Sequence, residues 1–122
     1  MNDWKRRKVC NAFIWNATPS SALQGHALNV ANHMGRVMGG LWVGGSITAT
    51  PQGLLFSANA MNRALHDGLE DIFIPSSDIQ SITRVFGWVS GIVVVRHELG
   101  EFRFRCFGAK QFATELATRF EV

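Results

Sequence analysis

Apolar and polar residues alternate most regularly near the end of the chain, over residues 101–107. One face of this segment would hold Phe102, Phe104 and Cys106, and the opposite face would hold Glu101, Arg103 and Arg105. The pattern predicts a half-buried β-strand. The preceding segment Ile92–His97 is rich in β-branched residues, and Leu99-Gly100 offers a turn between the two. We therefore expect a β-hairpin here.

Apolar runs bounded by glycine, proline and polar residues predict five further short strands. These are His26–Asn32, Gly40–Ala49, Gly53–Ser57, Asp71–Pro75 and Ile79–Phe86. Between the second and third, Thr50-Pro51-Gln52-Gly53 predicts a turn, because proline presets φ and glycine tolerates a positive φ. With the hairpin, the strands have the number and spacing that are typical of a barrel or sandwich.

The hydrophobic period changes after residue 108. From Ala109 to Phe120 the large apolar residues Phe112, Leu116 and Phe120 recur every four positions, which predicts one amphipathic helix packed against a sheet. The sequence as a whole therefore predicts a mainly β fold. We expect a seven-stranded antiparallel barrel or sandwich that is capped by one C-terminal α-helix.

Three groups of residues resemble the motifs of GRAM domains, which have the pleckstrin-homology-like fold. They are Gly40-Leu41-Trp42-Val43 with Gly53-Leu54-Leu55-Phe56-Ser57, then Ile74-Pro75-Ser76-Ser77-Asp78-Ile79-Gln80-Ser81-Ile82, and finally Phe102-Arg103-Phe104 with Phe112. They follow the family's order, although Gly44–Ile47 lengthens the first hairpin. The resemblance implies a pleckstrin-homology-like domain over residues 25–122, preceded by a basic and aromatic extension over residues 1–24. It also implies a noncatalytic scaffold that binds lipid head groups, membranes or protein segments.

Net charge is concentrated at the start of the chain. The 122 residues include twelve Lys and Arg against nine Asp and Glu, which gives a net charge of +3. The segment Lys5-Arg6-Arg7-Lys8 against Asp3 accounts for this excess, since eight basic residues meet eight acidic ones from residue 9 onward. A body without net charge releases few counterions on DNA or RNA. We therefore expect no nucleic-acid partner.

Residues that could carry catalysis are scattered along the sequence. The histidines at positions 26, 33, 66 and 97 fall in different predicted elements and match no metalloprotease, nucleophile-elbow or phosphate-loop motif. The acidic residues around His66 fit a solvated loop better than a metal site. The two cysteines lie far apart, and Cys106 falls on an apolar strand face as a core residue. We expect no catalytic activity, no cofactor and no bound metal.

The first candidate binding surface is the connection that follows the predicted strand Ile79–Phe86. Phe86 and Trp88 would lie at its tip with Arg84 beside them, and an exposed aromatic tip can enter a bilayer interface. The alternative is that Trp88 folds back over the end of the barrel. Arg36, in a predicted loop, is a further residue that we expect near lipid phosphates.

The basic segment Lys5, Arg6, Arg7 and Lys8 is the second candidate, because clustered bases beside aromatic residues are attracted to anionic membranes. The alternative is a charged terminus that only aids solubility.

The third candidate is an outer-face basic patch of Arg96, Arg103 and Arg105. A two-residue turn at Leu99-Gly100 would place Arg96 opposite Arg103, which is unfavourable unless an anion or an acid joins them. Glu98 and Glu101 are close enough in sequence to these arginines to supply that acid, so we favour a self-compensated solvated face.

Together these features favour a noncatalytic binding module that associates peripherally with a membrane surface or an acidic lipid. The alternative is a protein-interaction or self-association module, which includes a homo-oligomer. Glycine and proline interrupt the long uncharged stretches and argue against a transmembrane helix. We expect a cytoplasmic protein, peripheral at the inner face of the membrane.

Overall fold

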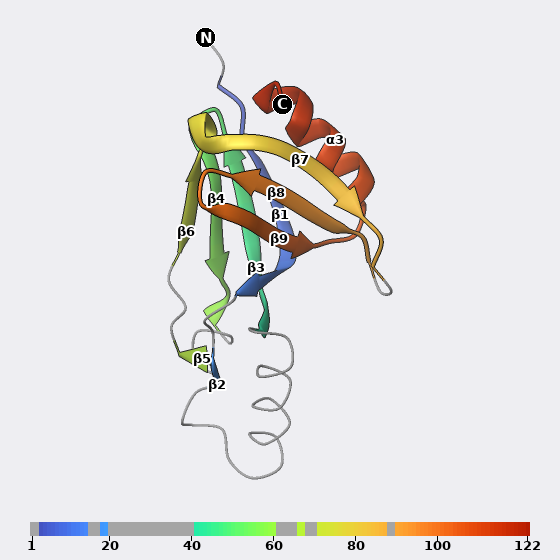
Figure 1. Cartoon of the computed structure of the whole chain (residues 1–122). Helices are drawn as coiled ribbons and strands as arrows, with labels where there is room; N and C mark the ends of the chain where they lie inside the picture. Colours follow the sequence, from blue (N-terminus) through green and yellow to red (C-terminus); the bar gives the residue numbers. More distant parts are fainter. Residues whose placement is uncertain (1–2, 15–17, 20–40, 61–65, 68–70, 88–89) are drawn as a thin grey trace.

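The computed structural model describes residues 3–14, 18–19, 41–60, 66–67, 71–87 and 90–122. The predicted strand His26–Asn32 lies outside these residues. Seven antiparallel strands form one sheet, in the order β6-β4-β3-β1-β9-β8-β7 (Figure 1). Their bounds are β1 Arg6–Ile14, β3 Leu41–Thr50, β4 Gly53–Ala58, β6 Ile72–Pro75, β7 Ile79–Val85, β8 Ile92–His97 and β9 Gly100–Arg105.

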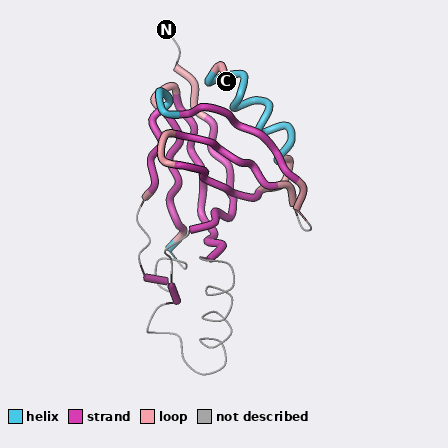
Figure 2. Tube along the Cα trace, viewed as in Figure 1, coloured by secondary structure: helices cyan, strands magenta, loops and turns pink. Residues whose placement is uncertain are grey.

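The remaining elements in the described residues are short, apart from one helix at the end of the chain. Strands β2 (Thr18–Pro19) and β5 (His66–Asp67) pair with each other, and the 3-10 turn η1 (Ser76–Asp78) separates β6 from β7. Helix α3 spans Ala109–Phe120 (Figure 2). The predicted fold class, a mainly β domain of seven antiparallel strands followed by one C-terminal helix, is confirmed. Within the described residues no helix combines the length and the hydropathy that crossing a bilayer requires.

The sheet curls so that its two halves face each other. Strands β3, β4 and β6 run at a steep angle to β7, β8 and β9 (Figure 1). Phe56 on β4 and Phe102 on β9 are three places apart in the strand order, which is about 14 Å in a flat sheet. Their ring centroids are nevertheless only 6.0 Å apart. The inward-facing residues of both halves therefore form one core.

Helix α3 covers this core beside β7 and β8. Phe112 and Leu116, at the four-residue spacing seen in the sequence, are 2% and 0% exposed. Burying a side chain of this size contributes about 1.5–3 kcal/mol. Phe112 also packs edge-on against Phe104 of β9, with ring centroids 6.1 Å apart. The helix is therefore held to the sheet by the apolar stripe that predicted it.

Strand β1 lies in the middle of the sheet, although its residues belong to the segment 1–24 that the sequence set apart as an extension. It pairs with β3 over nine residues and with β9 at Asn11 and Ala12. The sequence of apolar and polar residues does not indicate this strand, because the exposed Val9 points outward while the half-buried Lys8 points inward. The two halves of the sheet are joined through this strand.

The β8–β9 hairpin has a different register from the predicted one. The turn occupies Glu98 and Leu99, and Gly100 already belongs to β9 with a φ of 134°. Arg96 therefore lies opposite Glu101, and Arg103 lies opposite Val94. The prediction that Arg96 lies opposite Arg103 is wrong, since it placed the turn one residue too late.

Both cysteines are buried free thiols in the core, as predicted for Cys106. Burial, with a smaller contribution from the neighbouring Cys106, raises the pKa of Cys10 to about 12. Burial also raises the pKa of Cys106, which the nearby Lys8 partly offsets. Neither thiol is activated as a nucleophile.

Candidate functional site

Two exposed aromatic residues mark the end of the sheet where β7 and β9 finish and β8 and α3 begin (Figure 1). Val85, Ile92 and Arg105 form one row across the three strands. Phe86 and Phe107 follow just beyond this row, and they are 68% and 79% exposed. Large apolar side chains exposed together at one end of a domain are typical of an interaction surface.

Three basic side chains surround the same end. Arg84 is exposed on β7, and Lys110 is exposed in the first turn of α3. The Lys8 ammonium lies 5.6 Å from the centroid of the Phe112 ring and only 3.6 Å from where a Cβ on Gly108 would be. Lys8 therefore also reaches the start of α3.

No acidic side chain neutralises these bases in the part of the chain that the structure describes. The salt bridges found there involve other arginines. The first turn of α3 holds no acidic residue, and its N-cap is Gly108, which has no side chain to cap the helix. Because a helix N-terminus carries a partial positive charge, the local field adds to that of the bases. We call this end of the domain, formed by Lys8, Arg84, Phe86, Phe107 and Lys110, the basic aromatic end.

A shallow hollow of about 260 Å³ lies within the basic aromatic end. It is lined by Arg84, Phe86, Gly87, Gly91, Gly108, Ala109 and Lys110. A Cβ on Gly91 would lie 2.8 Å from the Cβ of Ala109, so glycine lets the start of β8 approach the start of α3. Gly108 adopts a left-handed conformation with φ of 69°, which favours glycine there. Small residues thus leave the space between Arg84 and Lys110 open.

The predicted basic segment Lys5–Lys8 is largely built into the fold. The Arg6 Nε lies 2.7 Å from a carboxylate oxygen of Glu115 on α3, and Arg119 binds the same oxygen at 3.2 Å. Burial raises the pKa of Glu115, but the hydrogen bonds from Arg6 and Arg119 outweigh this and lower it overall. Lys5 and Arg7 remain exposed.

The outer-face arginines are largely occupied by partners within the fold. Glu101 accepts hydrogen bonds from Arg96 at 3.1 Å and from Arg103 at 3.0 Å. The bond from Arg103 is the main cause that lowers the pKa of Glu101. The Arg105 guanidinium stacks 4.2 Å from the centroid of the Trp42 ring, although its buried Nε has no hydrogen-bond partner among the described residues. A self-compensated face is therefore what the geometry favours here.

Of the residues that the sequence singled out, the structure brings Arg84, Phe86 and Lys8 together at one end. Trp88 and Arg36 lie outside the described residues. Sequence reasoning missed Phe107 and Lys110. Phe107 had a usable signal, because it is an aromatic residue in the polar phase of the alternation that ends at residue 107.

Comparison with known proteins does not assign a family. The chain matches no model of a known protein family. A search of curated protein sequences gives no match either. Among the described side chains, no group of three His, Cys, Asp or Glu residues converges in a way that could hold a metal ion.

Proposed function

We propose that the protein is a noncatalytic binding module that attaches reversibly to an anionic lipid surface through the basic aromatic end. The observation that carries this proposal is the placement of two exposed phenylalanines among three bases without an acidic partner in the described structure. Aromatic rings can enter the interface while neighbouring bases meet the negative head groups. The resemblance to GRAM domains supports the same conclusion.

The contributions of these side chains suit reversible attachment. Each base near an anionic surface adds about 1 kcal/mol. Each phenylalanine adds about 1.5 kcal/mol when it is partly buried in the interface. The total is on the order of 6 kcal/mol, which corresponds to a dissociation constant of tens of micromolar. We therefore expect binding that depends on salt and on the fraction of anionic lipid.

Cosedimentation with phosphatidylcholine vesicles, with and without phosphatidylserine, tests the proposal at low and high salt. We expect binding only to the anionic vesicles, with release at high salt. Phe107→Ser should weaken binding about tenfold, and Arg84→Gln combined with Lys110→Gln should weaken it about thirtyfold. Leu99→Ser is the matched control, because Leu99 is 92% exposed but lies in the β8–β9 turn at the other end of those strands.

Equal binding by the Phe107→Ser and Leu99→Ser variants would contradict insertion at the basic aromatic end. Binding that is indifferent to salt and to phosphatidylserine would contradict the electrostatic contribution.

A second candidate function, self-association, is favoured by one observation on the opposite edge of the sheet. Leu55 on β4 and Phe73 on β6 lie directly opposite each other, and they are 36% and 51% exposed. Strand β6 ends the strand order, and such an edge can pair with another chain. Light scattering after size-exclusion chromatography tests this. A dimer that Phe73→Lys abolishes would support it, and a monomer at every concentration would contradict it.

A further inference from the structure

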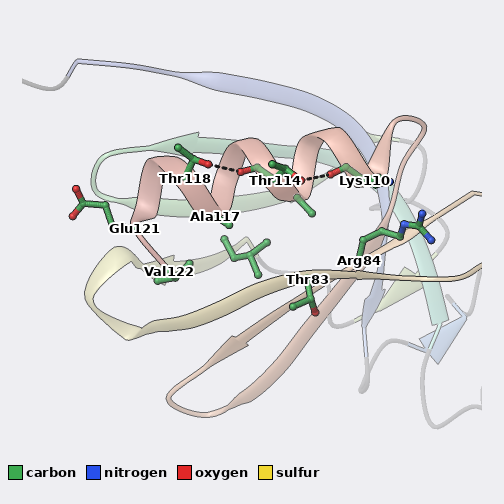
Figure 3. Close-up of a pocket in the computed structure, with 10 residues that line it drawn as sticks. Thr83, Arg84, Lys110, Thr114, Ala117, Thr118, Glu121 and Val122 are labelled. Carbon is green, nitrogen blue, oxygen red and sulfur yellow. Dashed lines mark hydrogen bonds between the residues drawn. The ribbon is translucent and has the colours of Figure 1, made fainter.

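A second, larger concavity lies between strand β7 and helix α3 (Figure 3). This groove has a volume of about 660 Å³. It is lined by Ile82, Thr83 and Arg84 from β7, and by Lys110, Ala113, Thr114, Ala117, Thr118, Glu121 and Val122 from α3 and its end. The groove runs along the helix, away from the exposed rings of Phe86 and Phe107.

One wall of the groove is an edge of the sheet. Among the described strands β7 pairs only with β8, and it ends the strand order. In the described part of the chain no backbone hydrogen bond joins β7 to α3. The register irregularity lies between Ile79 and Ser81, so the later part of the strand is regular. From Thr83 to Val85 its residues are exposed. An edge of this kind can accept an additional strand through its backbone N–H and C=O groups.

The other wall, formed by helix α3, leaves room for an extended chain. Its middle turns present only small side chains toward the groove, at Ala113, Thr114, Ala117 and Thr118. The hydroxyls of Thr114 and Thr118 donate to backbone carbonyls of the helix itself, at 3.0 and 2.9 Å (Figure 3). Eleven helical steps separate Lys110 from Glu121, which is about 17 Å of wall. An extended segment of about five residues has this length.

Charge distinguishes the two ends of the groove. Arg84 and Lys110 lie at one end and Glu121 lies at the other, as Figure 3 shows. Neither Arg84 nor Lys110 forms an ion pair with an acidic residue in the described structure. A bound segment would therefore be oriented by an acidic residue at the Arg84 end.

We propose that the groove binds an extended segment of a partner protein, which adds a strand to β7 and places an acidic residue against Arg84 and Lys110. This inference goes beyond lipid attachment and uses a different part of the surface, although the two sites share these two bases. Backbone pairing with β7 supplies affinity, and the paired bases select the charge at one end of the segment.

Selection from a displayed library of random eight-residue peptides on the full chain tests this proposal. We expect enrichment of peptides with β-branched residues that end in one or two acidic residues. The enriched peptide should bind the Arg84→Glu, Lys110→Glu double variant at least tenfold more weakly. The matched control is the Lys5→Glu, Arg7→Glu double variant, which has the same net charge but alters exposed bases outside the groove.

A backbone test then separates strand addition from charge attraction alone. The enriched peptide is compared with versions that carry N-methyl groups on alternate amides, in one phase or the other. Methylation in the phase that faces β7 should weaken binding at least tenfold, whereas methylation in the other phase should not. Amide chemical shifts should change at residues 82–85 and along residues 110–121. Equal loss in both phases, or shifts elsewhere, would overturn the proposal.

The result is distinguishable from that of the lipid proposal. Thr114 is exposed and lines the groove, so Thr114→Trp should fill the groove and abolish peptide binding without affecting attachment to phosphatidylserine vesicles. Phe107→Ser should have the opposite pattern. If no peptide is enriched, or if Thr114→Trp binds the enriched peptide normally, the groove is not a peptide site. Vesicle binding by the same protein would then leave lipid attachment standing alone.

Discussion

Removal of residues 1–8 is expected to destabilise the fold and not only to remove charge. The deletion eliminates the first three residues of β1, which pair with β3 at Ala49, Thr48 and Ile47. It also removes Trp4, whose ring packs edge-on against Phe120 with centroids 5.3 Å apart. Helix α3 would then lose its contacts with Trp4, Arg6 and Lys8.

The size of the effect follows from these contacts. The backbone hydrogen bonds between the three deleted residues of β1 and β3 contribute about 1 kcal/mol each. The Trp4–Phe120 ring pair contributes about 1 kcal/mol beyond its burial. The exposed pair between Arg6 and Glu115 contributes less than about 1 kcal/mol. We therefore expect a loss on the order of 4 kcal/mol, which is a large part of the 5–15 kcal/mol that stabilises a typical domain.

Urea denaturation followed by tryptophan fluorescence measures this loss. The midpoint should fall by about 2 M or more in the truncated chain. The control is the Lys5→Gln, Arg7→Gln variant, which removes two exposed charges from the same segment and should shift stability by less than about 0.5 kcal/mol. A truncated chain with the midpoint of the full chain would refute the assignment of β1 to the sheet. Charge effects on vesicle binding should therefore be measured with point variants.

Three further predictions concern the helix and the core. Leu116→Ala truncates a side chain that is 0% exposed, so it should lower the free energy of unfolding in chemical denaturation by about 2–5 kcal/mol. A decrease below about 1 kcal/mol would contradict the packing of Leu116 in the core. Glu115 has a folded pKa below its ordinary value of 4.5, so its stabilising contribution is present above that pH and is lost as pH falls through the folded pKa. The stability difference between the wild type and Glu115→Gln should accordingly shrink below pH 4.5, and a constant difference would exclude this linkage. Cys10 and Cys106 should react with iodoacetamide at pH 8 far more slowly in the folded protein than in urea, as mass spectrometry would show.

Much of the fold could be predicted from the sequence, because most of its elements follow one regular hydrophobic period. Strand β9 alternates strictly, and helix α3 repeats large apolar residues every four positions. Strand β1 breaks its own alternation, since the inward-pointing Lys8 places its ammonium over the ring of Phe112. The sequence therefore identified the elements that are amphipathic and missed the one whose inner face is partly basic.

The site was only partly predictable for a related reason. Arg84 and Phe86 lie in one connection, so the sequence could group them. Phe107 and Lys110 join them only because β9 ends beside the start of β8, which depends on the order of strands in the sheet. The hairpin register also depended on Gly100, which begins β9 instead of serving in the turn. Pairings across strands are non-local, so one sequence position cannot determine them.

The central place of β1 also bears on how the chain reaches its native state. Strands β3, β4 and β6 form one set of neighbours in the sheet, and β7, β8 and β9 form another, so within each set the paired strands are close in sequence. The pairing of Asn11 with Arg105, in contrast, joins residues that are 94 positions apart in the chain. Closing so long a loop carries an entropic penalty and slows folding. The docking of β1 between the two meanders is therefore expected to limit the folding rate, and substitutions at this seam should alter kinetics more than those in either hairpin.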